Sequence, residues 1–291
     1  MLIRGLTLAI ALFVAPSAFA QNGLPALSDH PLPGNTGINA FSWVNPAGEV
    51  DIPEMIEITA KVQQAQDHLA GSSTGIFRVQ IPFSTWIAFS VDGRVERWHT
   101  NTTQGQILLP DLNGRTEGGD FNFRTMIRVL RDNPKNLCPA VTLKATTKTA
   151  SGDFLTSRRY TDSAGYEIGI ATSKALHMDT ETIQKLRFFL EVAFVAWDTK
   201  VGQQDDSYKF AGGFEVATER HSLQVSFLGF NGWMDGALDQ VNSLNGEYRY
   251  HADKRIDLSL SGSVGLTEAA NPWMLAAGIH CYLNRFSRRN Q

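Results

Sequence analysis

The sequence predicts an all-β fold, an antiparallel up-and-down transmembrane β-barrel of about 12 strands. Three observations predict it. The first 20 residues have the layout of an export signal. From residue 54 onward, apolar and polar side chains alternate in segments of about 8 to 13 residues, close to the ~9–11 residues with which a tilted strand crosses a bilayer. The connections between these segments also alternate between short and long.

The N-terminus reads "MLIRGLTLAIALFVAPSAFA", with Arg4 before a short apolar core and with Ala18, Phe19 and Ala20 at its end. This is the pattern of a cleavable secretory signal peptide. We therefore expect residues 1–20 to be a signal peptide that is cleaved near Ala20, which implies export. An uncleaved membrane anchor is the alternative, and the short apolar core disfavours it.

Residues 21–53 are rich in proline and glycine and show little alternation. We interpret them as an irregular periplasmic segment that precedes the barrel. Two possibilities stay open: this segment enters the barrel mouth through Phe41, Trp43 and Val44, or "INAFSWV" adds a short strand. The remaining parts of the chain would be the barrel at 54–286 and a C-terminal tail at 287–291.

The expected strands follow one another along the chain, each with apolar side chains on one face and polar ones on the other. Before residue 186 they are "MIEITAKVQ", "IFRVQI", "STWIAFSV", "FNFRTMIRVL", "AVTLKATTK" and "GYEIGIATSK". After residue 197 they are "YKFAGGFEVA", "LQVSFLGF", "LNGEYRY", "RIDLSLSGSVG" and "WMLAAGIHCYL".

The segment between them, "LRFFLEVAFVAW", is ambiguous when taken alone. A helix would place Arg187 and Glu191 four residues apart on one face, whereas a strand would place both opposite Phe188 and Leu190. Short apolar runs do not distinguish the two structures by periodicity. Because the segments on either side alternate with a period of two, this segment is predicted to be a strand as well.

The connections favour a barrel whose two ends differ. Short periplasmic turns and long outer loops predict connections that alternate in length, and an even strand count returns both chain ends to the periplasm. The connections follow this rule with one exception, "ALHMDTETIQK", which is too long for its side. In this interpretation the stretches 64–74 and 94–120 are long outer loops.

A soluble exported β-sandwich or lipocalin-like barrel is the alternative fold, because one buried face also produces alternation. The apolar faces are rich in aromatic residues, and the polar faces combine charges with interrupting Gly and Ser. This combination favours a lipid-facing outside and a polar interior.

The composition of the chain is compatible with a membrane barrel. The formal net charge is −3 and no region is strongly basic, so nucleic acid is not expected as a partner. After the signal no apolar run approaches the ~18 residues of a membrane helix, and mean hydropathy is −0.17. Barrel strands face lipid with alternate residues only, so membrane lipid remains the expected partner.

Cysteine and histidine usage does not support a metal or redox site. Cys138 and Cys281 lie far apart in the sequence, so their pairing stays open although an exported protein can form a disulfide. The seven histidines are scattered, and the C-x-x-C spacing is absent. We expect no metal and no cofactor.

The charged side chains of the polar faces form the first candidate site. An unpaired ion away from water costs several kcal/mol, so pairs such as Arg187–Glu191 and Glu247–Arg249 are expected to neutralise each other. Two functions stay open for these charges: an ionic plug that fills a narrow barrel, or a charged constriction on a solute path. The lumen-facing candidates are Arg78, Arg124, Arg128, Lys144, Glu167, Arg187, Glu191, Lys209, Glu215, Glu247, Arg249 and Asp257.

A second candidate site is the expected outer loop "SGDFLTSRRYTDSAG", with Asp153, Arg158, Arg159 and Asp162. These charges either hold the loop together or bind an anion or a sugar headgroup through the adjacent guanidinium groups. Trp98, at the base of the longest expected loop, is interpreted as a residue of the aromatic belt at the membrane interface.

Catalysis is a separate possibility, because some outer-membrane barrels are hydrolases. His99, His221 and His280 lie near serines or threonines, but no G-x-S-x-G or H-E-x-x-H spacing accompanies them. No catalytic residue is therefore named. Catalysis would gain support if His221 or His99 lay with a serine and an acid or amide within hydrogen-bond reach.

The later half of the chain resembles a known family. In "CPAVTLKATTKTASGDFLTSRRYTDSAGYEIGIATSKAL" the matching positions are Lys148, Gly152, Asp153, Thr161, Asp162 and Gly165. This segment and the closing hairpins from "LNGEYRY" onward resemble the outer-membrane barrel family labelled "meta-pathway of phenol degradation". "SWVNPAGEV" and "VDGRVERWHT" are more similar to a sister outer-membrane family. One departure is the polar end "SRRNQ", where such barrels usually finish on an aromatic residue.

The resemblance implies an outer-membrane barrel that passes small hydrophobic or aromatic molecules. Our hypothesis is accordingly a narrow channel or transporter for small molecules in the bacterial outer membrane. The alternatives are a plugged structural barrel without transport and an outer-membrane hydrolase. The solute and the oligomeric state stay open.

Overall fold

The computed structural model describes most of the chain from residue 49 to residue 283. The described ranges are 49–66, 70–100, 116–133, 136–149, 164–178, 183–198, 204–232, 240–267 and 270–283, with residues 103, 106 and 114. The expected signal peptide at 1–20 and the tail at 287–291 lie outside these ranges, as do Phe41, Trp43 and Val44, and they remain predictions.

Thirteen strands of the described residues form one sheet, of which twelve are long and β4 has 3 residues. The strands are β1 (Ile56–Gln66), β2 (Ala70–Pro82), β3 (Ile87–Thr100), β4 (Thr116–Gly118), β5 (Asn122–Leu130), β6 (Ala140–Lys148), β7 (Gly165–His177), β8 (Lys185–Asp198), β9 (Gln204–Ala217), β10 (His221–Gly232), β11 (Gln240–His251), β12 (Ile256–Gly265) and β13 (Trp273–Leu283).

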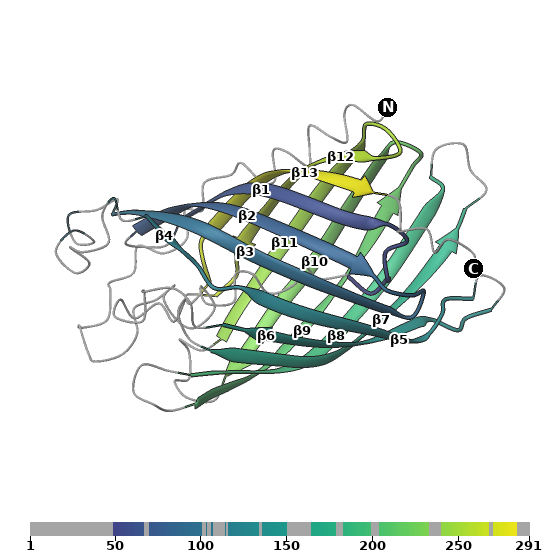
Figure 1. The fold of residues 1–291 in the computed structure, drawn as a ribbon, viewed down its shortest axis with the longest axis horizontal. Coiled ribbons are helices and arrows are strands. Elements are labelled where there is room, and N and C mark those ends of the chain that lie inside the picture. Colours follow the sequence, from purple (N-terminus) through teal and green to yellow (C-terminus); the bar gives the residue numbers. More distant parts are fainter. Residues whose placement is uncertain are drawn as a thin grey trace, which may run out of the picture.

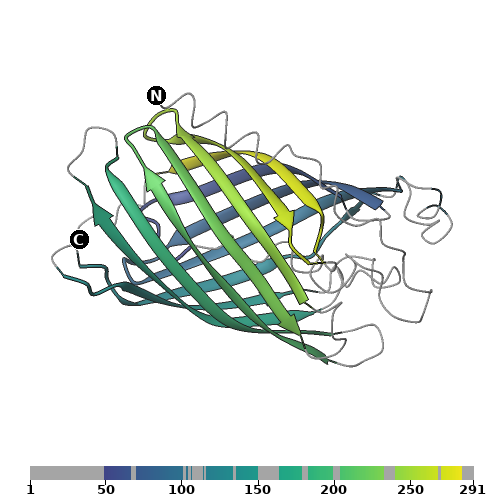
Figure 2. The same ribbon diagram turned by 180° about the vertical axis from the view of Figure 1, so that it is seen from behind.

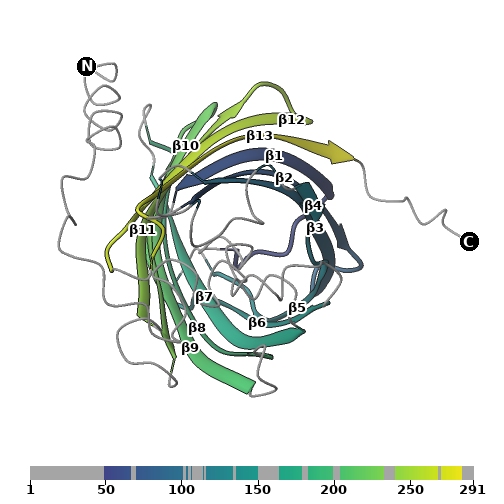
Figure 3. The same ribbon diagram turned by 90° about the vertical axis from the view of Figure 1, so that its left-hand side faces the viewer.

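The sheet closes on itself into a barrel. Each long strand pairs antiparallel with the next along the chain, and β13 pairs with β1 to complete the ring, with His280 opposite Thr59. β4 and β5 pair in succession with the same strand, β3, so together they fill one place in the ring. Figures 1 and 2 show the tilted strands from both sides, and Figure 3 shows the ring along the barrel. This confirms the predicted antiparallel barrel of about 12 long strands.

The two faces of the barrel differ as the alternation predicts. On β8, Phe188 and Leu190 lie on the outer face and are 48% and 63% exposed. Phe189 and Glu191, which alternate with them, lie on the inner face and are each 2% exposed. The same parity holds around the ring: the exposed large side chains of the strands are mainly apolar, and the buried ones include many charged groups. A water-soluble barrel would show the reverse pattern.

Both described ends of the ring, the start of β1 and the end of β13, lie at the barrel end that carries the connections 83–86, 131–139, 178–184, 218–220 and 252–255. The opposite end carries 101–115 and 149–164, the longest connections. The predicted outer loop at 64–74 is wrong, since β1 and β2 pair from Gln66 and Gly71 onward and leave a short connection. The small polar residues of β2 hid this pairing, because they show no apolar alternation.

Residues 49–52 pass through the inside of the ring rather than outside it. Val50 is fully buried against the inward side chains of four successive strands, Ala140, Ala171, Phe189 and Ala211. The Oγ1 of Thr142, on the inner face of β6, donates to the carbonyl oxygen of Val50 at 2.6 Å. The end of the expected periplasmic segment at 21–53 therefore lines the interior, which the sequence left open.

Two smaller findings complete the description. Among the described residues there is no helix that is long and apolar enough to span a membrane. Cys138 and Cys281 are both free and half-buried, so they are not joined in a disulfide.

Gly213 gives a test of the packing between the inserted segment and the wall. A Cβ at this position would lie 2.2 Å from the carbonyl oxygen of Val225 and 2.8 Å from the ring of Phe189, which packs on Val50. We expect Gly213→Ala to lower the free energy of unfolding by about 1–3 kcal/mol, the usual cost of overpacking. The measurement is the urea midpoint of the folded form, followed by heat-modifiable gel mobility.

Gly75→Ala is the control, because the nearest atom to a Cβ there is the carbonyl oxygen of Val95 at 3.9 Å. It should leave the urea midpoint unchanged or raise it slightly. Equal losses for both variants would contradict the assigned packing.

Candidate functional site in the barrel interior

The structure places all twelve lumen-facing candidates on the inner face of the ring, buried or partly buried. They do not form one continuous cluster; instead they divide into groups with separate partners. The outer-loop candidates Asp153, Arg158, Arg159 and Asp162 lie outside the described residues.

The most deeply buried group joins β6, β7, β8 and β9. The Nζ of Lys144 lies 2.8 Å from one carboxylate oxygen of Glu191, and the Nζ of Lys209 lies 2.6 Å from the other. Lys209 also contacts Glu167 at 3.2 Å. Two lysines thus compensate two glutamates away from water, where an isolated ion would cost several kcal/mol. This group fills its side of the barrel.

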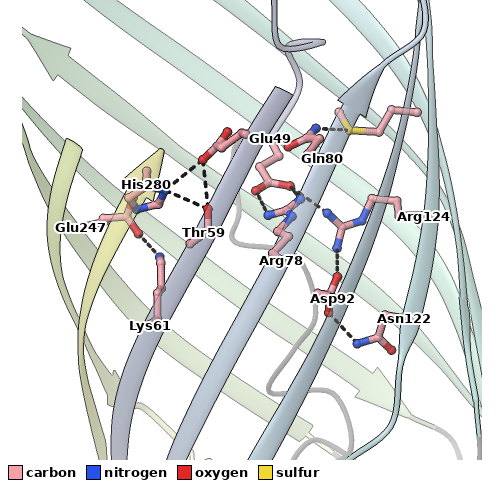
Figure 4. Close-up of polar contacts among 12 residues, drawn as sticks. Glu49, Thr59, Lys61, Arg78, Gln80, Asp92, Asn122, Arg124, Glu247 and His280 are labelled. Carbon is pink, nitrogen blue, oxygen red and sulfur yellow. Dashed lines mark hydrogen bonds and ion pairs between the residues drawn. The ribbon is translucent and has the colours of Figure 1, made fainter. Parts of the chain in front are cut away.

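A second group ties Glu49 of the inserted segment to the wall. Both terminal nitrogens of Arg78 donate to the two carboxylate oxygens of Glu49, and Nη1 of Arg124 donates to Oε2 at 2.9 Å. Burial alone would raise the pKa of Glu49, but the charges of the two arginines outweigh burial and hold its pKa well below the ordinary value. Glu49 is therefore a carboxylate at neutral pH. Figure 4 shows it between the two guanidinium groups.

Asp92 lies on the other side of the same arginines. Its carboxylate accepts a hydrogen bond from the amide of Asn122 at 2.7 Å and lies 3.7 Å from Nη2 of Arg124. Arg78 and Asp92 also face each other in the register of β2 and β3. The arginine pair thus has one carboxylate from a strand and one from the inserted segment (Figure 4).

Asp51 provides a second charged anchor for the segment. Its carboxylate lies 3.2 Å from Nη1 of Arg187 and 3.7 Å from Nη2 of Arg128. Arg187 also contacts Glu215 at 2.6 Å, from the neighbouring strand β9. The predicted Arg187–Glu191 pair is therefore replaced by pairing between strands and with the segment. Interstrand pairing wins because opposed side chains on adjacent strands lie closer than those four residues apart along one strand.

A third group lies on the opposite wall. Glu247 bridges Lys61 at 2.8 Å and Arg249 at 2.7 Å, so the predicted Glu247–Arg249 contact is present. Asp257 accepts a hydrogen bond from the hydroxyl of Tyr282 at 2.8 Å. These groups are less buried than the lysine–glutamate group, with Arg249 29% exposed.

His280 has the neighbours that would support catalysis. Its Nε2 lies 3.0 Å from the Oγ of Ser259, and its Nδ1 lies 2.9 Å from Glu57 and 3.1 Å from the Oγ1 of Thr59. Ser259, however, is not among the residues that line the interior cavity. We therefore interpret this arrangement as a buried hydrogen-bond network that joins β12, β13 and β1. His221 is exposed and contacts Tyr248.

A cavity of about 240 Å³ lies between the Glu49 group and the wall formed by β10 to β13. Its lining is mixed: charged groups from β1, β2, β3, β5 and β11 face apolar side chains such as Leu228, Phe230 and Val241. The cavity therefore lies away from β6 to β9, where the inward charges pair with one another. Within the described ranges, no cluster of three or more His, Cys, Asp or Glu side chains is arranged to hold a metal ion.

Sequence reasoning missed the partners that the segment and β3 contribute. Asp92, Arg94 and Glu96 are buried on the inner face of β3. Arg94 and Glu96 fall in the stretch 94–120 that was interpreted as a loop, and Asp92 lies just before it. The alternation in "VDGRVERWHT" was the available signal for them. Glu49 and Asp51 had no such signal, because they precede the strands.

The interpretation of Trp98 as a residue of the outer aromatic belt is wrong. Trp98 is only 4% exposed and lies on the inner face of β3. The reason is that β3 continues to Thr100, so its parity places Trp98 on the same side as Asp92, Arg94 and Glu96.

The fold is shared with outer-membrane channels and porins. An outer-membrane channel from Pseudomonas putida F1 matches with a TM-score of 0.60 and 11% identity, over 82% of this chain and 100% of that one. The NanC porin matches with a TM-score of 0.53 and 10% identity over 78% of this chain and 100% of its own. The KdgM porin, in a complex with disordered oligogalacturonate, matches with a TM-score of 0.50 and 8% identity over 78% and 99%.

At these identities the likeness concerns the fold. No protein-family profile matches the sequence, and no curated protein matches it. The fold thus defines an outer-membrane type of β-barrel, while the resemblance to the family labelled "meta-pathway of phenol degradation" stays a prediction.

Glu191 gives a test of charge compensation in the interior. Glu191→Gln leaves Lys144 and Lys209 with one carboxylate fewer at a fully buried site. We expect the free energy of unfolding to fall by about 3–5 kcal/mol, as when one partner of a buried ion pair is removed. The urea midpoint of the folded form measures the loss.

Glu247→Gln is the matched variant, since Glu247 also bridges two cations but lies where water reaches Arg249. Its loss should be clearly smaller. A larger loss for Glu247→Gln than for Glu191→Gln would show that burial does not set these energies.

Proposed function

We propose that this protein is a narrow channel for small molecules in the bacterial outer membrane, constricted by its own residues 49–52. The observation that carries the proposal is the partly open interior: a cavity with charged walls runs beside a segment that is held by side chains and is not a strand of the sheet. A plugged structural barrel would need no such cavity. The fold shared with an outer-membrane channel and two porins supports the same function.

The outer face supports a membrane location. Its exposed side chains form an apolar surface around the ring, which hydrocarbon would cover and water would not. The predicted signal peptide at 1–20 provides the export that an outer-membrane location requires. In this arrangement the end of the barrel with both described chain ends faces the periplasm.

The solute would be small and would combine a polar group with an apolar body. The cavity holds about 240 Å³ beside the inserted segment, which excludes large solutes while the segment is in place. Its walls pair charged groups with apolar side chains such as Phe230 and Leu228. The predicted hydrophobic or aromatic solutes agree with the apolar part of this lining only.

A plugged barrel without transport is the second candidate. The dense ion pairs on the side of β6 to β9 favour it, because they close that half of the interior. The two candidates differ in whether current flows through the folded protein.

The membrane location can be tested at Leu190, which is 63% exposed near the middle of β8. Leu190→Arg should destabilise the folded barrel in lipid vesicles by about 2–4 kcal/mol, the cost of a cation at the bilayer midplane. Leu176→Arg, at the end of β7, should cost about 0–1 kcal/mol, since charges near the interface are tolerated. The urea midpoint in vesicles measures both. Equal costs for Leu190→Arg and Leu176→Arg would contradict the membrane depth assigned to the two residues.

The channel can be tested by conductance in planar bilayers. The wild-type protein should give small current steps, and Val50→Lys should give larger ones. The substituted cation would lie in the apolar site of Val50 and beside the cations that anchor the segment, so the segment should leave the wall. Glu54→Gln, at an exposed position two residues after the segment, makes the same change in charge and should conduct like the wild type. Folded barrels that carry no current in any form would favour the plugged barrel.

A further inference from the structure

We propose that Arg78 and Arg124 form a binding site for the carboxylate of a small organic anion, and that Glu49 occupies this site when the anion is absent. The inference rests on the proposed channel function and deepens it, because it names the class of solute. It is carried by the contacts of Glu49, by the unused donors of the two arginines and by the charges of the cavity.

The contacts of Glu49 resemble those of a bound ligand more than those of a wall residue. Its carboxylate receives a two-pronged contact from Arg78 and a third hydrogen bond from Arg124 at 2.9 Å. The planar guanidinium group matches a carboxylate in this way, and lysine does not. The two arginines are fixed on β2 and β5, whereas Glu49 precedes the first strand. Glu49 can therefore leave without breaking any strand pairing.

The two arginines retain donors that Glu49 does not use. The Nε atoms of Arg78 and Arg124 are buried and have no hydrogen-bond partner among the described residues. Buried donors without acceptors are rare in proteins and call for an explanation. An anion with more acceptor atoms, or one placed deeper between the two groups, would use them.

The charges around the cavity require an anion when Glu49 moves away. Arg78 and Arg124 share two carboxylates in this group, Glu49 and Asp92, of which Asp92 lies 3.7 Å from Nη2 of Arg124. Without Glu49, the two arginines would keep only Asp92 of these two. Because uncompensated charge is costly at a buried site, release of the segment is favoured by an anion that takes its place.

The lining of the cavity indicates what the anion carries besides its carboxylate. The cavity that the arginine pair lines is also lined by Leu228, Phe230 and Val241, on β10 and β11. An apolar body the size of one aromatic ring would lie against these side chains and bury its surface. The site thus fits a small aromatic or aliphatic acid, and displacement of Glu49 would couple its entry to release of the constricting segment.

Benzoate is the probe for this site and benzamide is its uncharged analogue. Isothermal titration calorimetry on the folded protein should show that Glu49→Gln binds benzoate about tenfold more tightly than the wild type, since a tethered competitor has been removed. Glu54→Gln, which removes an exposed carboxylate two residues after the segment, should bind benzoate like the wild type. Benzamide should bind much more weakly than benzoate to every variant.

Arg124→Lys tests the geometry of the site, because it keeps the charge but loses the fork. In the Glu49→Gln background it should abolish the tenfold gain. Equal benzoate affinity in the wild type and Glu49→Gln, or equal binding of benzamide, would overturn the proposal. Should Glu49→Gln fail to fold, the wild type alone decides: benzoate must raise its urea midpoint and benzamide must not.

This experiment separates the inference from the channel function. Benzoate binding by a folded barrel that carries no current would leave the site in place and remove the channel. Current steps that do not respond to benzoate, together with unchanged affinity in Glu49→Gln, would leave the channel and remove the site.

Discussion

Charge compensation inside the ring is the constraint on which the rest of the structure depends. A closed sheet with an apolar outer face has to place its ionic groups inside, where each needs a partner of opposite charge. On one side the strands satisfy this requirement themselves, through Lys144, Lys209, Glu167 and Glu191. Around four arginines of the wall they do so only in part, and residues outside the sheet provide further carboxylates.

Glu49 and Asp51 are those carboxylates, and their alternation with Val50 and Ile52 explains how a segment without strand pairing is held. The acids contact four arginines on three strands, while Val50 and Ile52 pack on apolar side chains of the wall. The arginines hold the segment through its side chains. The hydrogen bond from Thr142, on β6, to the Val50 carbonyl also holds its backbone. A segment attached in this way can be displaced by a competing anion, which a barrel strand cannot.

The interior thus combines a rigid wall with one exchangeable component. The lysine–glutamate group and the His280 network join neighbouring strands, and Ser259, the hydroxyl partner of His280, does not line the cavity. The arginine pair differs because it faces the cavity and is compensated in part from outside the sheet. For the proposed function, the number of charges in the interior therefore matters less than which charges belong to strands and which belong to residues 49–52.

The sequence by itself determined the closed antiparallel barrel and the facing of its side chains. These follow from a local rule, because in a strand the side chain at every second position points to the same face. Where alternation was clear, as in β6 and β12, the facing of the side chains was predictable. The facing was not predictable where small polar residues replaced the apolar ones in β2. It was also not predictable where the second half of β3, from residue 94, was interpreted as a loop, which misplaced Trp98.

Only the tertiary structure decided which charges meet. Arg187 could pair with Glu191 by sequence, but closure of the ring and entry of residues 49–52 brought Glu215 and Asp51 closer. Pairing across the interior depends on strand register, on ring closure and on the path of a segment without periodicity, and none of these is encoded in the spacing of residues along one strand. For this reason the inward-facing residues of the strands could be predicted from the sequence, but the site that they form with Glu49 could not.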